Sequence, residues 1–204
     1  ETYERIPLMY AVLSSKNNIK DIEEIRLSNL EVLNNKPSAL NDKAIVWLSY
    51  SVHGNESSST EASMQTLYYL LTKNYDLLEN TIVIIDPCLN PDGRDRYANW
   101  YNQVRTMPYT SDKISKEHSE PWPGGRANHY LFDLNRDWAW LTQIESELRL
   151  KEYQRWLPHV HVDFHEQGIN EPYYFAPAAE PYHEVITNWQ REFQQAIGLS
   201  LIHI

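Results

Sequence analysis

Apolar positions along the chain follow two spacings, which together predict alternating strands and helices. Continuous runs rich in β-branched and aromatic residues indicate buried strands, and they lie at Ala44 to Val52, Thr81 to Asp86 and Val160 to Phe164. A shorter run predicts a strand at Tyr173 to Ala176. Helical spacing predicts helices at Asp21 to Leu33, Ser57 to Leu71, about Asp137 to Trp156 and about Tyr182 to Ile197.

The segment between the second strand and the third helix is expected to be a long loop. It begins with the turn-forming residues Asn90-Pro91-Asp92-Gly93 and reaches about Asp137 with little periodicity. Prolines and glycines recur along it, including Pro121, Pro123 and the pair Gly124-Gly125. Because loops of this length in compact domains are usually functional, we expect this one to form the wall of a site.

The alternation of strands and helices predicts an α/β fold with a layered sheet. In such folds, functional sites collect at the carboxyl ends of the strands. The sequence shows no internal repeat and no low-complexity linker, so a single domain over residues 1–204 is the simplest division. A chain of 204 residues with 42% hydrophobic content can bury a sizeable core.

Composition excludes several classes of partner and site. The net charge of −10 argues against nucleic acid or an anionic membrane as the main partner, because both require a basic surface. No run of eighteen apolar residues predicts a transmembrane segment. With Cys88 as the single cysteine, a metal site must be built from histidine and carboxylate.

Such ligands occur where two predicted strands end. His53 and Glu56 follow the strand Ala44 to Val52, where a tight turn can direct an imidazole and a carboxylate to one point. Around the third strand, alternate residues are polar and share one face: His159, His161, Asp163 and His165. Two histidines and a glutamate, with a fourth position left for water, are typical of catalytic zinc. For the third ligand we prefer His165 to His161, because His165 lies at the carboxyl end of its strand.

Four short motifs in a fixed order resemble the zinc carboxypeptidase family of carboxypeptidase A-like metallopeptidases. They are His-Gly-Asn-Glu at 53–56, Asn-Pro-Asp-Gly at 90–93, Asp-Leu-Asn-Arg at 133–136 and Asp-Phe-His at 163–165. The resemblance implies a mixed β-sheet flanked by helices, of the zinc exopeptidase type. It also implies one zinc ion per chain and a peptide or protein substrate with a free C-terminus.

Roles in the family carry over only where a motif matches. The resemblance makes His53, Glu56 and His165 the zinc ligands and Asp133 the carboxylate that supports the first histidine. Asn135 and Arg136 correspond to the pair that grips the C-terminal carboxylate of the substrate.

An arginine that polarises the scissile carbonyl is also expected from the resemblance. Arg105 has the family's spacing from the Asn-Pro-Asp-Gly motif, while Arg94, Arg96 and Arg126 are the competing arginines.

The family's proton-accepting glutamate has no matching motif in this sequence. Candidates after the third ligand are Glu166, Glu171, Glu180 and Glu184, and we assign the role to none of them. The sequence ends at Ile204, so we expect it to be part of a longer protein whose last strands and proton acceptor lie further on. Asn55 and the segment Glu166-Gln167-Gly168 differ from the digestive members, which indicates a divergent branch.

The expected function is zinc-dependent removal of C-terminal residues from peptides through a metal-activated water. Two alternatives remain open: an N-acyl amino acid deacylase or amidase with a similar site, and a catalytically silent peptide-binding module. The resemblance favours a secreted or periplasmic protein, whereas the sequence indicates neither the preferred side chain nor the oligomeric state.

Overall fold

A computed structural model describes residues 1–32, 36, 42–168, 170–172 and 174–202 of the chain. It divides into two compact units, residues 1–166 and 167–204. The first unit contains β1 (Ala11–Leu13), α1 (Lys16–Lys20), α2 (Ile22–Val32), β2 (Ala44–Tyr50), α3 (Ser58–Thr72), η1 (Tyr75–Glu79), β3 (Thr81–Asp86), α4 (Pro91–Val104), η2 (Lys116–His118), η3 (Leu134–Arg136), α5 (Ile144–Trp156) and β4 (Val160–Phe164). The second unit contains α6 (Asn188–Ile202).

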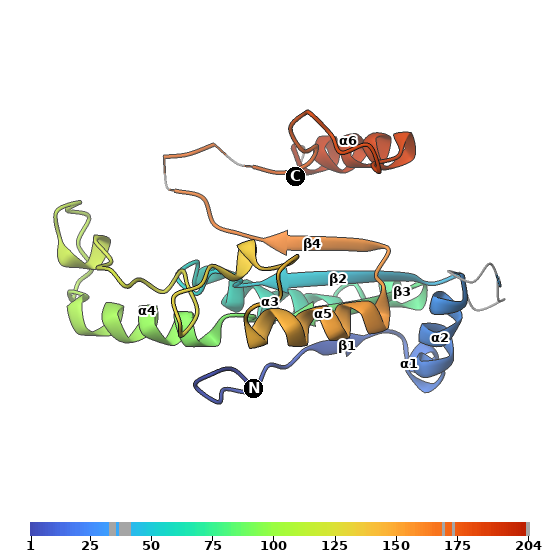
Figure 1. The fold of residues 1–204 in the computed structure, drawn as a ribbon, viewed down its shortest axis with the longest axis horizontal. Coiled ribbons are helices and arrows are strands. Elements are labelled where there is room, and N and C mark those ends of the chain that lie inside the picture. Colours follow the sequence, from blue (N-terminus) through green and yellow to red (C-terminus); the bar gives the residue numbers. More distant parts are fainter. Residues whose placement is uncertain (33–35, 37–41, 169, 173, 203–204) are drawn as a thin grey trace. The chain divides into compact units, whose positions relative to one another are not determined.

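The sheet of the first unit is mixed, as the family resemblance implies. Its four strands lie in the order β1-β3-β2-β4 (Figure 1). β2 pairs in parallel with both β3 and β4, whereas β1 pairs antiparallel with β3. The carboxyl ends of β2, β3 and β4 therefore meet at one edge, where the four family-like motifs begin or end.

Two apolar clusters hold helices on opposite faces of this sheet. On one face, Trp47 and Ile84 are buried with Ile25 of α2 and Trp156 of α5. On the other, Tyr50, Val83 and Ile85 pack with Leu78 of η1 and with Leu67 and Leu70 of α3. β2 and β3 alternate between the two clusters, so their β-branched and aromatic residues are buried on both sides of the sheet. This arrangement confirms the predicted α/β class.

The expectation of an irregular segment from Asn90 to Asp137 is wrong for its first part, which forms α4. The Asn90 side chain accepts a hydrogen bond from the Gly93 backbone N–H at 3.0 Å, and Pro91 occupies the first turn. Residues that favour a turn also start a helix well, since proline needs no N–H partner there. From residue 105 to 143 only the short η2 and η3 interrupt the loop.

Other predicted boundaries shift for local reasons. The third predicted helix begins at Ile144 rather than Asp137, because the Asp137 carboxylate accepts hydrogen bonds from the backbones of Thr142 and Gln143 and holds a loop. β2 ends at Tyr50, and Ser51 follows with a positive φ of 51°.

The second unit differs more from the prediction. Residues 174–176 form no strand, residue 173 lies outside the described residues, and α6 begins at Asn188 rather than Tyr182. On α6, the Trp189 and Phe193 rings stack at 5.1 Å, and the Arg191 guanidinium lies 4.9 Å from the Tyr182 ring. The Gln194 side chain accepts a hydrogen bond from the Ala178 backbone. These contacts pack the preceding turns against the helix.

Candidate metal centre

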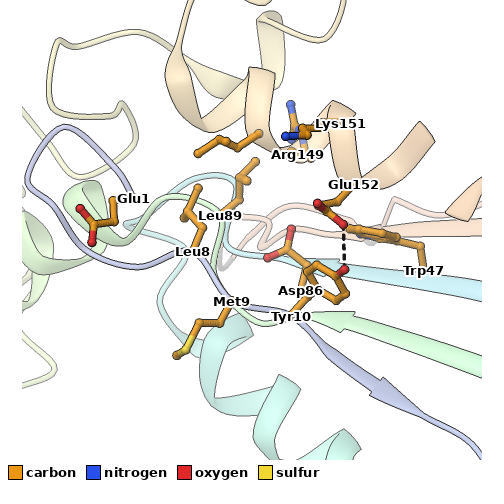
Figure 2. Close-up of a pocket in the computed structure, with 11 residues that line it drawn as sticks. Glu1, Leu8, Met9, Tyr10, Trp47, Asp86, Leu89, Arg149, Lys151 and Glu152 are labelled. Carbon is orange, nitrogen blue, oxygen red and sulfur yellow. Dashed lines mark hydrogen bonds between the residues drawn. The ribbon is translucent and has the colours of Figure 1, made fainter. Parts of the chain in front are cut away.

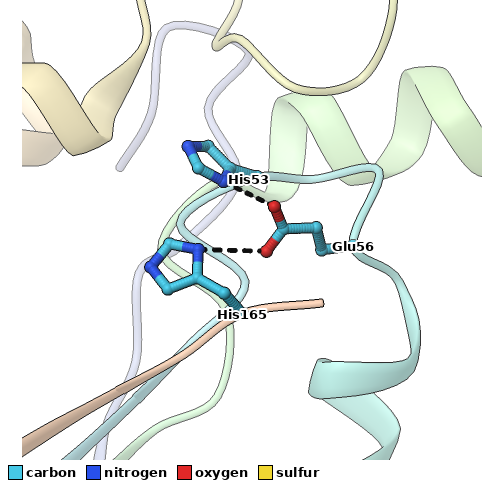
Figure 3. Close-up of side chains that lie close together, drawn as sticks. All are labelled: His53, Glu56 and His165. Carbon is cyan, nitrogen blue, oxygen red and sulfur yellow. Dashed lines mark hydrogen bonds and ion pairs between the residues drawn. The ribbon is translucent and has the colours of Figure 1, made fainter. Parts of the chain in front are cut away.

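The three predicted ligands meet at the carboxyl edge of the sheet. His53 and Glu56 lie in the turn that follows β2, and His165 directly follows β4, the parallel neighbour of β2. Figure 3 shows the Glu56 carboxylate between the two imidazole rings, with one oxygen directed to each. Parallel pairing thus brings together side chains that are more than a hundred residues apart in the sequence.

The distances within this group suit a small cation. Glu56 Oε1 lies 2.7 Å from His53 Nδ1, and Oε2 lies 3.1 Å from His165 Nδ1. One ligand atom from each residue lies within 4.8 Å of the others. The His53 side chain is 3% exposed, against 14% for Glu56 and 23% for His165, so the group opens to solvent on one side.

Each histidine is oriented by a second carboxylate on its far nitrogen. Asp133 Oδ1 lies 3.1 Å from His53 Nε2, and Asp163 Oδ2 lies 2.9 Å from His165 Nε2. Such pairs fix the tautomer and the ring orientation of metal-binding histidines. The role of Asp133 agrees with the family resemblance. Asp163 was noted only for its position on the strand, and the shared face with His165 was the signal that could have identified its role.

The electrostatics of the group follow from these contacts. Hydrogen bonds to Asp163 and Glu56 raise the pKa of His165 to about 10. Burial alone would raise the pKa of Glu56, but hydrogen bonds from His165 and His53 outweigh it and lower that pKa to about 2. The carboxylate is therefore ionised at neutral pH and available as a ligand.

Arg126 is the arginine that contacts the group. Its guanidinium donates to Asp133 Oδ2 at 3.0–3.1 Å, and Nη1 lies 3.4 Å from His53 Nδ1 and 3.9 Å from Glu56 Oε1. The sequence offered Arg126 only as a competitor to Arg105. Arg105 ends α4, is exposed, and makes no side-chain hydrogen bond or ion pair to the described residues.

The proposed carboxylate grip lies next to Asp133. Asn135 is half-buried in η3, and its backbone N–H donates to Asp133 Oδ1 at 2.9 Å. The Arg136 side chain is exposed and donates to the Asn135 carbonyl at 3.0 Å. Within the described part of the chain Arg136 forms no ion pair, so its remaining donors are available to an anionic ligand.

The other candidates have different partners. His161 Nε2 lies 3.1 Å from Ser49 Oγ, with its ring against Trp138 and Tyr153. Arg94 pairs with Glu61, and Arg96 donates to the carbonyls of Gly124, Ala127 and Asn128. The Glu166 carboxylate accepts from the Ser58 backbone and hydroxyl, and its own N–H donates to Glu56. Glu171 accepts from the Gly168 backbone, while Glu180 and Glu184 are exposed.

Three glycines let the turns around the group approach backbone to backbone. A Cβ on Gly54 would lie 2.1 Å from the Arg94 nitrogen, and one on Gly93 would lie 2.4 Å from the Gly125 carbonyl oxygen. A Cβ on Gly125 would meet the Gly93 oxygen at the same distance. The two motifs that contain Gly54 and Gly93 are thus parts of one packed structure that positions His53 and Glu56.

Two buried charged residues, Asp86 and Arg149, interact with Asp163 of the metal group's surroundings. Burial raises the pKa of Asp86, at the end of β3, to about 7, although the nearby Arg149 guanidinium opposes the shift. Arg149 lies 3.8 Å over the Trp138 ring and also interacts with Asp163, the partner of His165. Asp86 and Arg149 border a cavity of about 270 Å³ between α5 and the segment before β1 (Figure 2). None of its lining residues belongs to the metal group.

A family comparison agrees with this geometry. The model of the zinc carboxypeptidase family matches residues 1–200. The chain belongs to the zinc carboxypeptidase family. The resemblance read from the four motifs is thereby confirmed. Membership supports a metallocarboxypeptidase-like role for the chain.

Among solved structures, thrombin-activatable fibrinolysis inhibitor supports the zinc carboxypeptidase fold. Thrombin-activatable fibrinolysis inhibitor aligns over 100% of this chain and 50% of its own length, with 18% identity and a TM-score of 0.53. Carboxypeptidase A from Helicoverpa armigera aligns over 82% of this chain and 39% of its own, with 16% identity and a TM-score of 0.47. Bovine thrombin-activatable fibrinolysis inhibitor, solved in complex with tick carboxypeptidase inhibitor, aligns over 99% of this chain and 63% of its own length, with 17% identity and a TM-score of 0.49.

The chain therefore spans about 39% to 63% of the length of these structures. Comparison with curated protein sequences gave no significant match. In the described residues, no helix has both the length and the apolar character needed to cross a bilayer.

Proposed function

We propose that this chain forms the metal-binding part of a zinc-dependent carboxypeptidase that removes C-terminal residues from peptides. The observation that carries the proposal is the convergence of His53 Nδ1, Glu56 and His165 Nδ1, each histidine being held by a carboxylate on Nε2. Zinc bound there would polarise a peptide carbonyl and lower the pKa of the attacking water.

Residues around the zinc site would orient its ligands and bind the substrate. Asp133 and Asp163 hold the two rings so that both Nδ1 atoms face Glu56. Arg136, exposed and without an ion pair to the described residues, can receive the C-terminal carboxylate of a peptide together with Asn135. Such a grip would select peptides with a free C-terminus.

Arg126 is our candidate for stabilising the negative charge that develops on the carbonyl oxygen. Its Nη1 lies within 4 Å of both His53 and Glu56, and its side chain is 49% exposed, so it can turn toward a bound substrate. Arg105 has the family's sequence spacing but no contact that places it at the group. The geometry therefore favours Arg126 over Arg105.

Glu166 is a poor candidate for the acceptor of the water proton. Glu166 comes next to His165 in sequence, but its carboxylate already accepts two hydrogen bonds from Ser58 at 2.7 Å. These bonds hold it at the start of α3, where a negative charge is favoured by the helix dipole. Glu166 is better explained as a structural link between β4 and α3.

The proposal is tested by comparing three substrates: an N-blocked peptide, the same peptide with an amidated C-terminus, and an N-acyl amino acid. They should be assayed with this chain and with a protein in which it continues past position 204. We expect the longer protein to release the C-terminal residue of the first substrate only, and to lose this activity in the His165→Ala variant. Hydrolysis of the N-acyl amino acid alone would favour the deacylase. Tight zinc binding without turnover in the longer protein would favour the binding module.

We also propose that the protein acts outside the cytoplasm, in the periplasm or the extracellular medium. A single cysteine, Cys88, is compatible with an oxidising compartment because no disulfide is required for the fold. Fractionation of cells that express the full-length gene would test this, and retention in the cytoplasm would contradict it.

A further inference from the structure

A second group of metal-ligand side chains lies outside the site described above. Glu4 comes from the N-terminal segment, Asp92 from the first turn of α4, and His129 from the loop that leads to Asp133. One ligand atom from each lies within 4.8 Å of the others, by the same measure as in the first group. His129 Nδ1 is 2.9 Å from Glu4 Oε1. The three segments are distant in sequence and meet at this point.

The group is held in place by contacts of its own. Asp92 is 1% exposed, and the hydroxyl of Thr2 and the backbone N–H of Glu4 donate to its two oxygens. His129 follows the buried Asn128, whose side-chain oxygen accepts from the Tyr130 and Phe132 backbones and so fixes the loop. The Asp92 carboxylate and the loop backbone that carries His129 are therefore positioned before any ion binds.

A buried carboxylate beside this group points to a missing positive charge. Glu145 is fully buried, and its Oε1 has no hydrogen-bond partner among the described residues, while Oε2 accepts from Asn128 at 3.2 Å. Asp92 and His129 lie close enough to act on it: burial raises the pKa of Glu145, the charge of Asp92 raises it further, and His129 opposes this. Buried carboxylates are normally paired or bound to metal.

Arg96 does not supply that charge. Arg96 lies one turn after Asp92 on α4, but it donates to the carbonyls of Gly124, Ala127 and Asn128. Among the residues that the structure describes, Arg96 forms no ion pair. The His129 imidazole thus lies within 4.8 Å of the carboxylates of Glu4 and Asp92, with the Glu145 carboxylate close enough to interact, and this excess of negative charge favours a cation.

We propose that Glu4, Asp92 and His129 bind a divalent transition-metal ion, with Glu145 adding its charge from the buried side. An imidazole nitrogen with two carboxylates is a donor set that zinc accepts readily, whereas calcium and magnesium prefer oxygen ligands alone. The exposed Glu4 and His129 side chains can rotate to close the coordination shell, and water can complete it. The ion would tie the N-terminal segment to α4 and to the loop that carries Arg126.

The test counts zinc in a chain that lacks the first site. Purified His53→Ala protein is equilibrated with zinc alone near pH 7.5, and its stoichiometry and affinity are measured by metal analysis and by competition with a chromophoric chelator. We expect one zinc per chain. Adding His129→Ala or Glu4→Gln should weaken its binding by more than the 10–100-fold that is typical for supporting residues. Both side chains are about 40% exposed, so neither change should prevent folding.

His118→Ala in the same His53→Ala background is the matched control. His118 is 45% exposed and lies 3.7 Å from Glu117, so it is a histidine–carboxylate pair without a third ligand. The His118→Ala substitution should leave the zinc affinity unchanged. The proposal is overturned if His53→Ala protein binds no zinc, or if the bound zinc is insensitive to His129→Ala and Glu4→Gln. Neither result bears on the zinc site at His53, Glu56 and His165, so the two proposals can fail separately.

Discussion

At the scale of single residues, the sequence identified side chains at strand ends better than side chains in loops. His53, Glu56 and His165 could be grouped because strand parity and parallel pairing restrict where they lie. Asp163 shares that strand face with His165, yet its contact with Nε2 depends on a ring orientation that spacing does not determine. Arg126 belongs to a loop of nearly forty residues, whose path no periodicity predicts, so its contact with Asp133 emerged only from the structure.

Replacing Asp163 by Asn should weaken zinc binding at the first site about 10–100-fold, because His165 would lose the carboxylate that orients its ring. Asp133→Asn should have an effect of the same order through His53. Competition with a chelator measures both in the His129→Ala background, where the second group is removed. An unchanged affinity in Asp163→Asn would show that the Nε2 contact has no part in holding the metal.

Arg126→Ala should reduce kcat about 10²–10³-fold in a protein with carboxypeptidase activity, as expected when one donor to a developing oxyanion is lost. Arg105→Ala is the matched comparison and should change kcat much less. Steady-state kinetics on one peptide separate the two arginines. A large loss in Arg105→Ala with little change in Arg126→Ala would reverse our assignment and restore the one favoured by sequence spacing.

At the scale of elements, the strands and the helices α2 and α3 follow from hydrophobic pattern, since they pack apolar residues in the clusters on the two faces of the sheet. α5 adds Tyr153 and Trp156 to this packing but also buries the charged Glu145 and Arg149. α4 was missed because its first residues, Asn90-Pro91-Asp92-Gly93, have the composition of a turn. Its aromatic residues Tyr97, Trp100 and Tyr101 have helical spacing and were the available signal. The close approach of the glycine-containing turns could not be predicted, because it depends on segments far apart in sequence.

Gly54→Ala should lower the free energy of unfolding by about 1–3 kcal/mol, the usual cost of inserting a carbon into a packed site, and should weaken zinc binding as the turn shifts. Gly168→Ala is the control, because its Cβ would meet mainly the flexible Glu171 side chain, 3.1 Å away at the nearest atom. Denaturant unfolding followed by tryptophan fluorescence measures both. Equal stability of the two variants would contradict the proposed backbone contact.

The end of β3 should make stability depend on pH. Burial raises the pKa of Asp86 to about 7 in the folded chain, so between about pH 4 and 7 the folded state holds a proton that the unfolded state has released. The free energy of unfolding therefore falls as pH rises through this range, and the term vanishes in Asp86→Asn. Denaturant unfolding at pH 4.5 and 7.5 should show that the free energy of unfolding falls more in the original chain than in Asp86→Asn. The exposed Asp95→Asn variant is the control and should show the same fall as the original chain. If the free energy of unfolding fell equally with pH in Asp86→Asn and in the original chain, this account would be contradicted.

At the scale of the whole molecule, membership of the zinc carboxypeptidase family and the mixed sheet agree with the four ordered motifs. The motifs were informative as a set because three of them supply the side chains that meet at the candidate zinc site. These are His53, Glu56, Asp133, Asp163 and His165. The chain spans only part of the solved relatives, so catalysis by the complete protein is a proposal that rests on the site rather than on the fold.

The most direct test of the central claim is the zinc content of two single-histidine variants prepared in the His129→Ala background. His161 lies on β4 and His165 directly follows that strand, four positions later, and of the two only His165 contacts Glu56. We predict about one tightly bound zinc per chain in His161→Ala and none in His165→Ala, with both proteins folded by circular dichroism. Stoichiometric zinc in His165→Ala, or its loss in His161→Ala alone, would contradict the ligand set.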